Sequence, residues 1–279
     1  MQLTSIDRYP VKSCRGTTSD AAAVEPWGLA GDRRWMVVDA DGDVITAREA
    51  PRLLLAVPTV TATGLHVTAP DLPELDVTVP DGAAVAVHVW HSTVDAVPAD
   101  DETNAWFAAL TGREARLVHL ADPTQRQTND RFGAAGDRVS FADGYPLLVA
   151  TTASLDALND AVLEGPRADE GPLPMTRFRP NLVVGGAEPW AEDGWRRLRV
   201  GDAVFRAVKG CARCVMTTFD PWDVSKGKEP IATLARIRRF DGATWFGMNL
   251  IPDTPGAVIS AGDEVEILEA VAAPDGPPR

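Results

Sequence analysis

Short apolar runs broken by proline and glycine fill the first hundred residues, and they constrain the fold more than any other sequence feature. The runs cover residues 34–39, 44–48, 53–60, 65–69, 75–79 and 85–90. Because Pro and Gly end each run within a few residues, the pattern is typical of strands joined by turns. The runs 34–39 and 44–48 flank an Asp/Gly-rich turn and predict a β-hairpin.

Only three segments predict helices. In residues 101–110 the apolar face consists of Trp106, Phe107 and Leu110. Asp101 or Thr103 is the candidate N-cap of this helix, and Gly112 is expected to end it. Residues 152–163 and about 229–239 show the same helical spacing of apolar residues. Further strands are expected at the start of the chain and at 116–120, 182–184, 198–200, 203–208 and 262–268, with a loop at 121–136.

This order of elements predicts a strand-rich α+β fold with a barrel-like sheet and a few helices. No GxGxxG motif follows a strand, which argues against a dinucleotide-binding fold. We predict one domain over residues 1–111, a second over 112–269, and a flexible Pro/Gly-rich tail over 270–279.

The chain carries 27 basic and 40 acidic residues, a net charge of −13. Such a balance argues against binding to nucleic acid or to anionic membranes, although it allows a local basic pocket. The sequence contains neither a long apolar run nor a secretory signal, so we expect a cytoplasmic protein without membrane contact. Its three cysteines predict no disulfide framework.

The motif Cys211-Ala212-Arg213-Cys214 is the first candidate for chemistry. A single CxxC supplies only half of a closed zinc site. One alternative is a pair of small buried cysteines in a strand. The other is a thiolate that binds a soft metal, with Lys209 and Arg213 favouring the charged form. The segment that follows, 216–221, is expected to be extended, which argues against a thioredoxin-type site.

Three further motifs could hold an anion. Lys12 and Ser13 follow the first expected strand, Arg33 and Arg34 start another, and the motif around Arg179 precedes a third. The alternatives for these motifs are an exposed turn, an ion pair with Asp, and ordinary surface charge. No Ser/His/Asp-type triad is present. Together the motifs fit a metal attached to a phosphorylated organic ligand.

Eight segments in order resemble the MOSC family, which includes the mitochondrial amidoxime-reducing component and bacterial YcbX-type proteins. The resemblance spans residues 2 to about 268. The segments are YPVKSCRG, GDRRWMVVD, VITAREAPRL, FADGYPLLVATTASLDALN, FRPNLVV, CARCVMTTFDP, KEPIATLARIRR and PGAVISAGDEVEIL. The resemblance implies a MOSC N-terminal β-barrel domain followed by a MOSC β-barrel domain.

The family resemblance also implies a molybdenum cofactor whose metal is bound by Cys214. Thr218 and Asp220, just after the metal ligand, are candidates to face the substrate and act with Cys214 in catalysis. The implied cofactor contacts are Lys12, Ser13, Arg33, Thr152, Ser154, Arg179, Asn181 and Arg213. Ala212 stands where the family often has Ser, which removes one possible hydrogen bond near the cofactor.

The implied activity is molybdenum-dependent reduction of N-hydroxylated small molecules such as amidoximes, hydroxylamines and N-hydroxylated bases. Electrons would come from a separate protein: a ferredoxin, a flavodoxin-type reductase or a cytochrome b5-like protein. One alternative is a non-catalytic carrier of molybdenum cofactor or sulfur, and another is a structural zinc protein. Pyridoxal phosphate is not expected, because no lysine is a compelling Schiff-base former.

Overall fold

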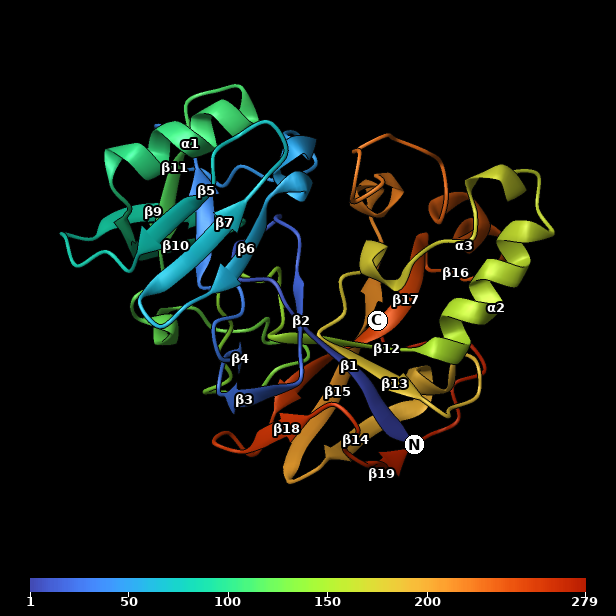
Figure 1. Cartoon of the computed structure of the whole chain (residues 1–279). Coiled ribbons are helices and arrows are strands. Elements are labelled where there is room, and N and C mark those ends of the chain that lie inside the picture. Colours follow the sequence, from blue (N-terminus) through green and yellow to red (C-terminus); the bar gives the residue numbers. More distant parts are fainter.

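Strands dominate the computed structural model, which describes residues 1–279, and three α-helices lie on its outer side (Figure 1). The predicted strand-rich α+β class is confirmed. The helices are α1 (Asp101–Thr111), α2 (Thr152–Leu163) and α3 (Ile231–Ile237). The first eleven strands are β1 (Gln2–Arg8), β2 (Thr17–Ser19), β3 (Ala21–Glu25), β4 (Gly28–Leu29), β5 (Trp35–Val38), β6 (Val57–Val60), β7 (Gly64–Thr68), β8 (Leu75–Thr78), β9 (Val85–Val89), β10 (Ser92–Pro98) and β11 (Arg116–His119).

The second half of the chain builds most of a nine-stranded sheet. The strands of this half of the chain are β12 (Leu147–Thr151), β13 (Leu182–Gly185), β14 (Trp195–Val200), β15 (Ala203–Ala212), β16 (Arg239–Phe240), β17 (Ala243–Pro252), β18 (Val258–Ser260) and β19 (Val265–Ala270). The strand order of the nine-stranded sheet is β19-β14-β15-β17-β12-β13-β1-β2, and β16 pairs with β17 at its side. Strand β18 belongs to another sheet, with β3 and β4. Strands β12 and β13 run parallel, and the other pairs are antiparallel.

The first strand of the chain belongs to this large sheet. Ile6 of β1 pairs with Leu182 of β13, and β3 pairs with β18 near the C-terminus. The side chains of Leu3 and Ile6 lie in a 19-residue core together with those of β12, β15 and β17. The start of the chain is therefore packed against residues beyond 112, and the predicted boundary at 111/112 remains a prediction.

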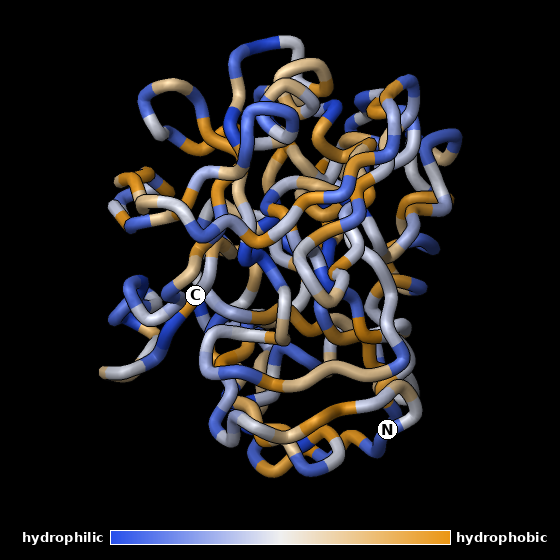
Figure 2. Tube along the Cα trace, turned by 60° about the vertical axis from the view of Figure 1, so that its left-hand side comes forward, coloured by the Kyte–Doolittle hydropathy of each residue, from blue (hydrophilic) through white to orange (hydrophobic).

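The rest of the first half has its own core under two smaller sheets, β5-β11-β10-β9 and β6-β7-β8. Trp106, Phe107 and Leu110 of α1 pack into this 21-residue core. Figure 2 shows polar and apolar residues interspersed along the trace. The sheet that contains β5 is buried on both faces, since Trp35 and Val37 lie in the 21-residue core while Met36 and Val38 lie in a separate nine-residue core.

The helix ends follow local capping chemistry. Asp100, rather than the predicted Asp101 or Thr103, caps α1: its carboxylate accepts from the backbone N–H of Thr103 at 2.8 Å. Gly112 ends this helix as predicted, in the left-handed conformation with φ +73°. Helix α2 has the predicted bounds. Helix α3 is shorter than predicted, since Pro230 is its N-cap and Arg239 already belongs to β16.

Three sequence predictions are wrong in detail. Strand β5 pairs mainly with β11, and the predicted hairpin with 44–48 is reduced to one antiparallel bridge, Val38 to Val44, and two backbone hydrogen bonds beside it. The start of the predicted strand 53–60 lies in a 3₁₀ turn, Pro51–Leu55. Another 3₁₀ turn, Val215–Thr218, stands where an extended segment was expected. In each case a long-range contact or a local turn outweighs the strand propensity.

The C-terminal segment lies against the large sheet. Pro277 is buried, and the carbonyl of Pro278 accepts from the backbone N–H of Gly210 in β15 at 2.8 Å. The guanidinium of Arg279 pairs with Asp241 at 2.5 Å. Residues predicted as a flexible tail thus make specific contacts. None of the helices has the length and apolar character needed to cross a membrane.

Replacing Ile6 by Ala tests whether β1 is part of the main core. Ile6 is fully buried, so the free energy of unfolding should fall by about 2–5 kcal/mol, from lost burial and the cavity left behind. Val79→Ala is the control, because Val79 is 44% exposed and should change stability by less than about 0.5 kcal/mol. Denaturant unfolding measures both, and equal effects would contradict this assignment.

Candidate functional site

The main pocket lies on the face of the nine-stranded sheet that turns away from its core. Leu147 and Val149 of β12 point into the core, as do Met248 and Leu250 of β17. Leu148 and Asn249, which are cross-strand partners, alternate with these residues and line the pocket. The sheet therefore forms the floor, and loops from both halves of the chain form the walls.

The pocket gathers most of the predicted cofactor contacts from segments far apart in sequence. The loop after β1 contributes two of them, the segment before β5 one, the segment before β13 two, and the two residues that follow β15 the rest. These lining residues are Lys12, Ser13, Arg33, Arg179, Asn181, Arg213 and Cys214. The structure thus brings together residues that the sequence presented as separate motifs.

The charge of the pocket wall is strongly positive, although the whole chain is acidic. Asp143 is the one carboxylate among the lining residues. The basic residues of the wall are Lys12, Arg33, Arg48, Arg177, Arg179 and Arg213. Two carboxylates behind the wall offset part of this charge: Asp32 pairs with Arg33 at 2.6 Å, as the alternative interpretation of that motif predicted, and Asp220 pairs with Arg177 at 3.2 Å. Arg179 and Arg213 have no carboxylate partner, so the wall still suits an anionic ligand.

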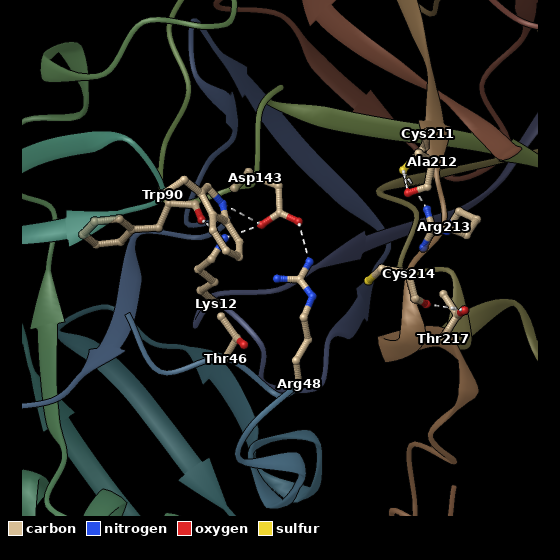
Figure 3. A network of polar contacts seen from close by, with 12 residues as sticks. Lys12, Thr46, Arg48, Trp90, Asp143, Cys211, Ala212, Arg213, Cys214 and Thr217 are labelled. Atoms are coloured by element: carbon tan, nitrogen blue, oxygen red, sulfur yellow. Dashed lines mark hydrogen bonds and ion pairs between the residues drawn. The ribbon is translucent and has the colours of Figure 1, made fainter. Parts of the chain in front are cut away.

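Asp143 ties the two halves of the chain together across the pocket (Figure 3). Its carboxylate lies 2.5 Å from Lys12 Nζ and 3.7 Å from Arg48 Nη2, and it accepts from Trp90 Nε1 at 3.3 Å. Burial would raise the pKa of Asp143, but Lys12 and Arg48 hold it well below its usual range. Burial lowers the pKa of Lys12 to about 8, although Asp143 acts in the opposite direction.

Arg126 positions the loop that carries Asp143. This buried guanidinium donates to the carbonyl of Ser140 at 2.8 Å and also to the carbonyls of Ala142 and Asp143. Burial lowers its pKa to about 10. The sequence analysis assigned no role to Arg126, Arg48 or Asp143. Two of them lie in family-like segments, VITAREAPRL and FADGYPLL, and these segments were the available signal.

Arg48, from the first half of the chain, lines the pocket together with Cys214. Burial lowers the pKa of Arg48, but the nearby Cys214 sulfur and the charge of Asp143 raise it above its ordinary value. Arg213 instead donates to Cys211 Sγ at 2.8 Å and to the carbonyl of Phe178 at 2.7 Å. The cation expected beside the Cys214 sulfur is therefore supplied by the first half of the chain.

Asn181 and Tyr9 position the two arginines of the opposite wall. The side-chain oxygen of Asn181 accepts from Arg33 at 2.9 Å and from the backbone of Leu148 at 3.2 Å. The guanidinium carbons of Arg33 and Arg179 both lie 4.2 Å from the centre of the Tyr9 ring. Since its amide is engaged within the protein, Asn181 acts by holding Arg33.

Three pocket residues adopt a backbone conformation that is rare outside glycine. The φ angles are +70° at Ser13, +47° at Arg33 and +56° at Arg179. Left-handed φ values in such residues cost free energy and cluster at functional sites. These turns place the three side chains on the pocket wall.

Four predicted site residues lie outside the pocket lining. Thr152 and Ser154 begin α2, and the Ser154 hydroxyl is buried in a hydrogen bond to Glu192 at 2.8 Å. The Thr218 hydroxyl donates to the carbonyl of Val215, and Asp220 pairs with Arg177 at 3.2 Å. Met216 and Thr217 line the pocket in this region instead.

Comparison with known proteins identifies both halves of the chain. A model described as the MOSC N-terminal beta barrel domain matches residues 1–114, and one described as the MOSC domain matches residues 136–266. The chain is 32% identical to mitochondrial amidoxime-reducing component 1 of Homo sapiens, covering 93% of this chain and 81% of that protein.

A molybdenum cofactor sulfurase of Oryza sativa subsp. japonica is also 32% identical, over 90% of this chain. This chain spans about a third (32%) of the length of that sulfurase. Among solved structures, the YUAD protein from Bacillus subtilis covers 95% of this chain and 93% of its own, with a TM-score of 0.41 and 11% identity.

Sulfate binding should weaken as the pH rises above about 8. Burial lowers the pKa of Lys12 to about 8, so Lys12 loses its proton in the empty pocket above this pH. Binding of an anion must then be accompanied by uptake of a proton, which weakens the observed affinity. The affinity should fall by up to about tenfold per pH unit, because sulfate keeps its own charge throughout. Calorimetric titration from pH 7 to 10 measures the slope. Lys12→Met should bind more weakly at pH 7 and lack the slope; an unchanged slope would exclude Lys12.

Asp143→Asn should strengthen sulfate binding by about tenfold at pH 5.5, a pH chosen to keep Lys12 protonated once the carboxylate that raises its pKa is removed. The substitution removes the carboxylate that now offsets Lys12 and Arg48, while keeping the size of the side chain. Asp202→Asn provides the control, since Asp202 is exposed and lies outside the pocket lining. Weaker binding in Asp143→Asn would mean that this carboxylate positions the cations more than it neutralises them.

Proposed function

Because the chain belongs to the MOSC family, we propose that its pocket binds the molybdenum cofactor and that the protein reduces N-hydroxylated small molecules. The observation that carries this proposal is a cysteine in a pocket wall with six basic residues and one carboxylate. A thiolate is the ligand type that soft metals prefer, and a phosphate-bearing ligand needs compensating cations.

The donor groups of the pocket fit this cofactor. The Nε atoms of Arg177 and Arg213 are buried and have no hydrogen-bond partner, and both side chains line the pocket. Lys12 and Arg48 share a single ion-pair partner, the carboxylate of Asp143. A phosphate carries a charge of about −1.5 to −2 at neutral pH, so it would offset several of these cations.

We assign roles from these positions. Cys214 would bind the metal, and Lys12, Ser13, Arg33 and Arg179 would hold the phosphate-bearing part. When bound, the cofactor would supply the two electrons needed to remove oxygen from an N–O bond. Arg48 would keep a positive charge beside the Cys214 sulfur, a contact of the kind that tunes a metal ligand.

Thr218 and Asp220 have no catalytic role in this proposal. The Asp220 carboxylate is paired with Arg177, and its other oxygen accepts from the backbone N–H of Trp222 at 2.8 Å. Thr152 and Ser154 are likewise left out, because both lie outside the pocket lining and Ser154 is bonded to the N-cap Thr151 and to Glu192. The cysteines, the basic residues and Thr217 remain as the groups that a bound ligand could contact.

The substrate class and the electron source follow from the relatives. The human relative is named for the reduction of amidoximes. We propose that a separate ferredoxin, flavodoxin-type reductase or cytochrome b5-like protein delivers the electrons. Similarity to a molybdenum cofactor sulfurase leaves a carrier function as the competing proposal, which predicts bound cofactor without turnover.

Replacement of Cys214 by Ala is the central test. Protein made in a host that synthesises the cofactor should contain about one molybdenum and one pterin per chain. The variant should lose the metal and at least about 99% of the reduction of benzamidoxime with reduced methyl viologen as donor. Elemental analysis, pterin fluorescence and product chromatography measure the three quantities.

Cys211→Ala is the matched control, since Cys211 lines the same pocket but bonds to Arg213. It should keep the metal. Cofactor without turnover in the wild type would favour the carrier function. Zinc without pterin would overturn the molybdenum assignment altogether.

A further inference from the structure

A second cavity, of about 190 Å³, lies behind one wall of the main pocket. Arg177, Arg179 and Met216 line both cavities and so form the shared wall. The remaining walls come from the end of β1, the loop that contains Arg15, and the segment 219–222 after the 3₁₀ turn of Cys214. Neither Lys12 nor Cys214 contributes to it.

Two guanidinium groups in this cavity lack a carboxylate partner in direct contact. Arg15 donates to the carbonyl of Leu54 at 3.2 Å and to that of Pro221. Arg179 donates to the carbonyl of Cys14 at 2.6 Å. Burial and the nearby charge of Arg33 lower the pKa of Arg179 to about 10. An anion in the cavity would relieve this excess of positive charge.

The carboxylates nearby are already engaged. Asp220 pairs with Arg177 at 3.2 Å. Burial lowers the pKa of Arg15, and the charge of Asp220 opposes this shift without a direct ion pair. Asp7, the one carboxylate that lines the cavity, accepts from the hydroxyls of Ser5 at 2.9 Å and Thr18 at 2.7 Å. The cavity lining thus sets three arginines, Arg15, Arg177 and Arg179, against the single carboxylate of Asp7, so its net charge favours an anion.

Aromatic rings form the other walls. Tyr9 and Phe219 are buried, whereas Trp222 is 54% exposed and lies at the rim. The guanidinium carbon of Arg15 lies 6.0 Å from the centre of the Trp222 ring. Aromatic faces and guanidinium planes both stack on planar groups, which adds shape preference to the charge preference.

We propose that this cavity binds a small aromatic anion, a planar ring that carries a carboxylate or a phosphate. Arg15 and Arg179 hold the anionic group, and Trp222 covers the ring from the rim. The site uses neither the metal ligand nor Lys12, but it shares Arg179 with the proposed cofactor pocket and to that extent rests on the proposed function. Its occupant would lie against Arg177 and Arg179, the wall that it shares with the main pocket.

The test measures phenyl phosphate binding to the full chain by calorimetry, with benzyl alcohol and inorganic phosphate as comparison ligands. Arg15→Gln should weaken phenyl phosphate binding by about tenfold, the value of one lost charge-assisted hydrogen bond. Trp222→Ala, at an exposed position that folding tolerates, should weaken it by about threefold or more. Benzyl alcohol should bind far more weakly than phenyl phosphate.

Two control variants separate this cavity from the main pocket and from general charge effects. Lys12→Met should leave phenyl phosphate binding at the second cavity unchanged while weakening inorganic phosphate. Arg34→Gln should change neither, since Arg34 also donates only to backbone carbonyls but lines neither cavity. Loss of phenyl phosphate binding in Lys12→Met but not in Arg15→Gln would overturn the proposal. Absent binding, or equal binding of benzyl alcohol, would overturn it too.

Discussion

The pairing of β1 with β13 is the contact on which the rest of the site depends. It places the loop after β1 beside the segment before β13, so that the backbones of Asp7 and Asn181 bond directly. Tyr9 then reaches Asp32 through its backbone and Pro180 through its hydroxyl. Since these bonds join residues up to 174 positions apart, the basic wall forms only when both halves of the chain are folded together.

The resulting pocket is an electrostatic exception within an acidic protein. A net charge of −13 repels anions at long range, yet the wall of the pocket concentrates cations at short range. Charge pairing and hydrogen bonding to carbonyls keep the cations in place: Asp143 for Lys12 and Arg48, and backbone oxygens for Arg126 and Arg179. Selectivity for an anion thus comes from burial and arrangement, not from overall charge.

The sequence predicted the fold class, and it singled out Lys12, Arg179 and Cys214 in compact motifs, whose roles stay predictions. It did not single out Arg48 and Asp143, because their contact depends on a distance between loops that no local pattern encodes. The predicted hairpin is shortened for the same reason, since the main partner of β5 lies about 80 residues further on in β11. Thr152 and Ser154, predicted as cofactor contacts, lie outside the pocket lining, where Ser154 bonds to Thr151 and Glu192.

The left-handed backbone at Ser13, Arg33 and Arg179 has a consequence for how this protein can be improved in the laboratory. Glycine at these positions would relax the main chain, but at Arg33 it would also leave the buried carboxylate of Asp32 without its ion-pair partner, and at Arg179 it would remove the bond to the carbonyl of Cys14. The strained backbone is therefore held in place by the same side chains that form the basic wall. A screen that rewards heat resistance alone should keep these two arginines, so robustness and the shape of the pocket are selected together.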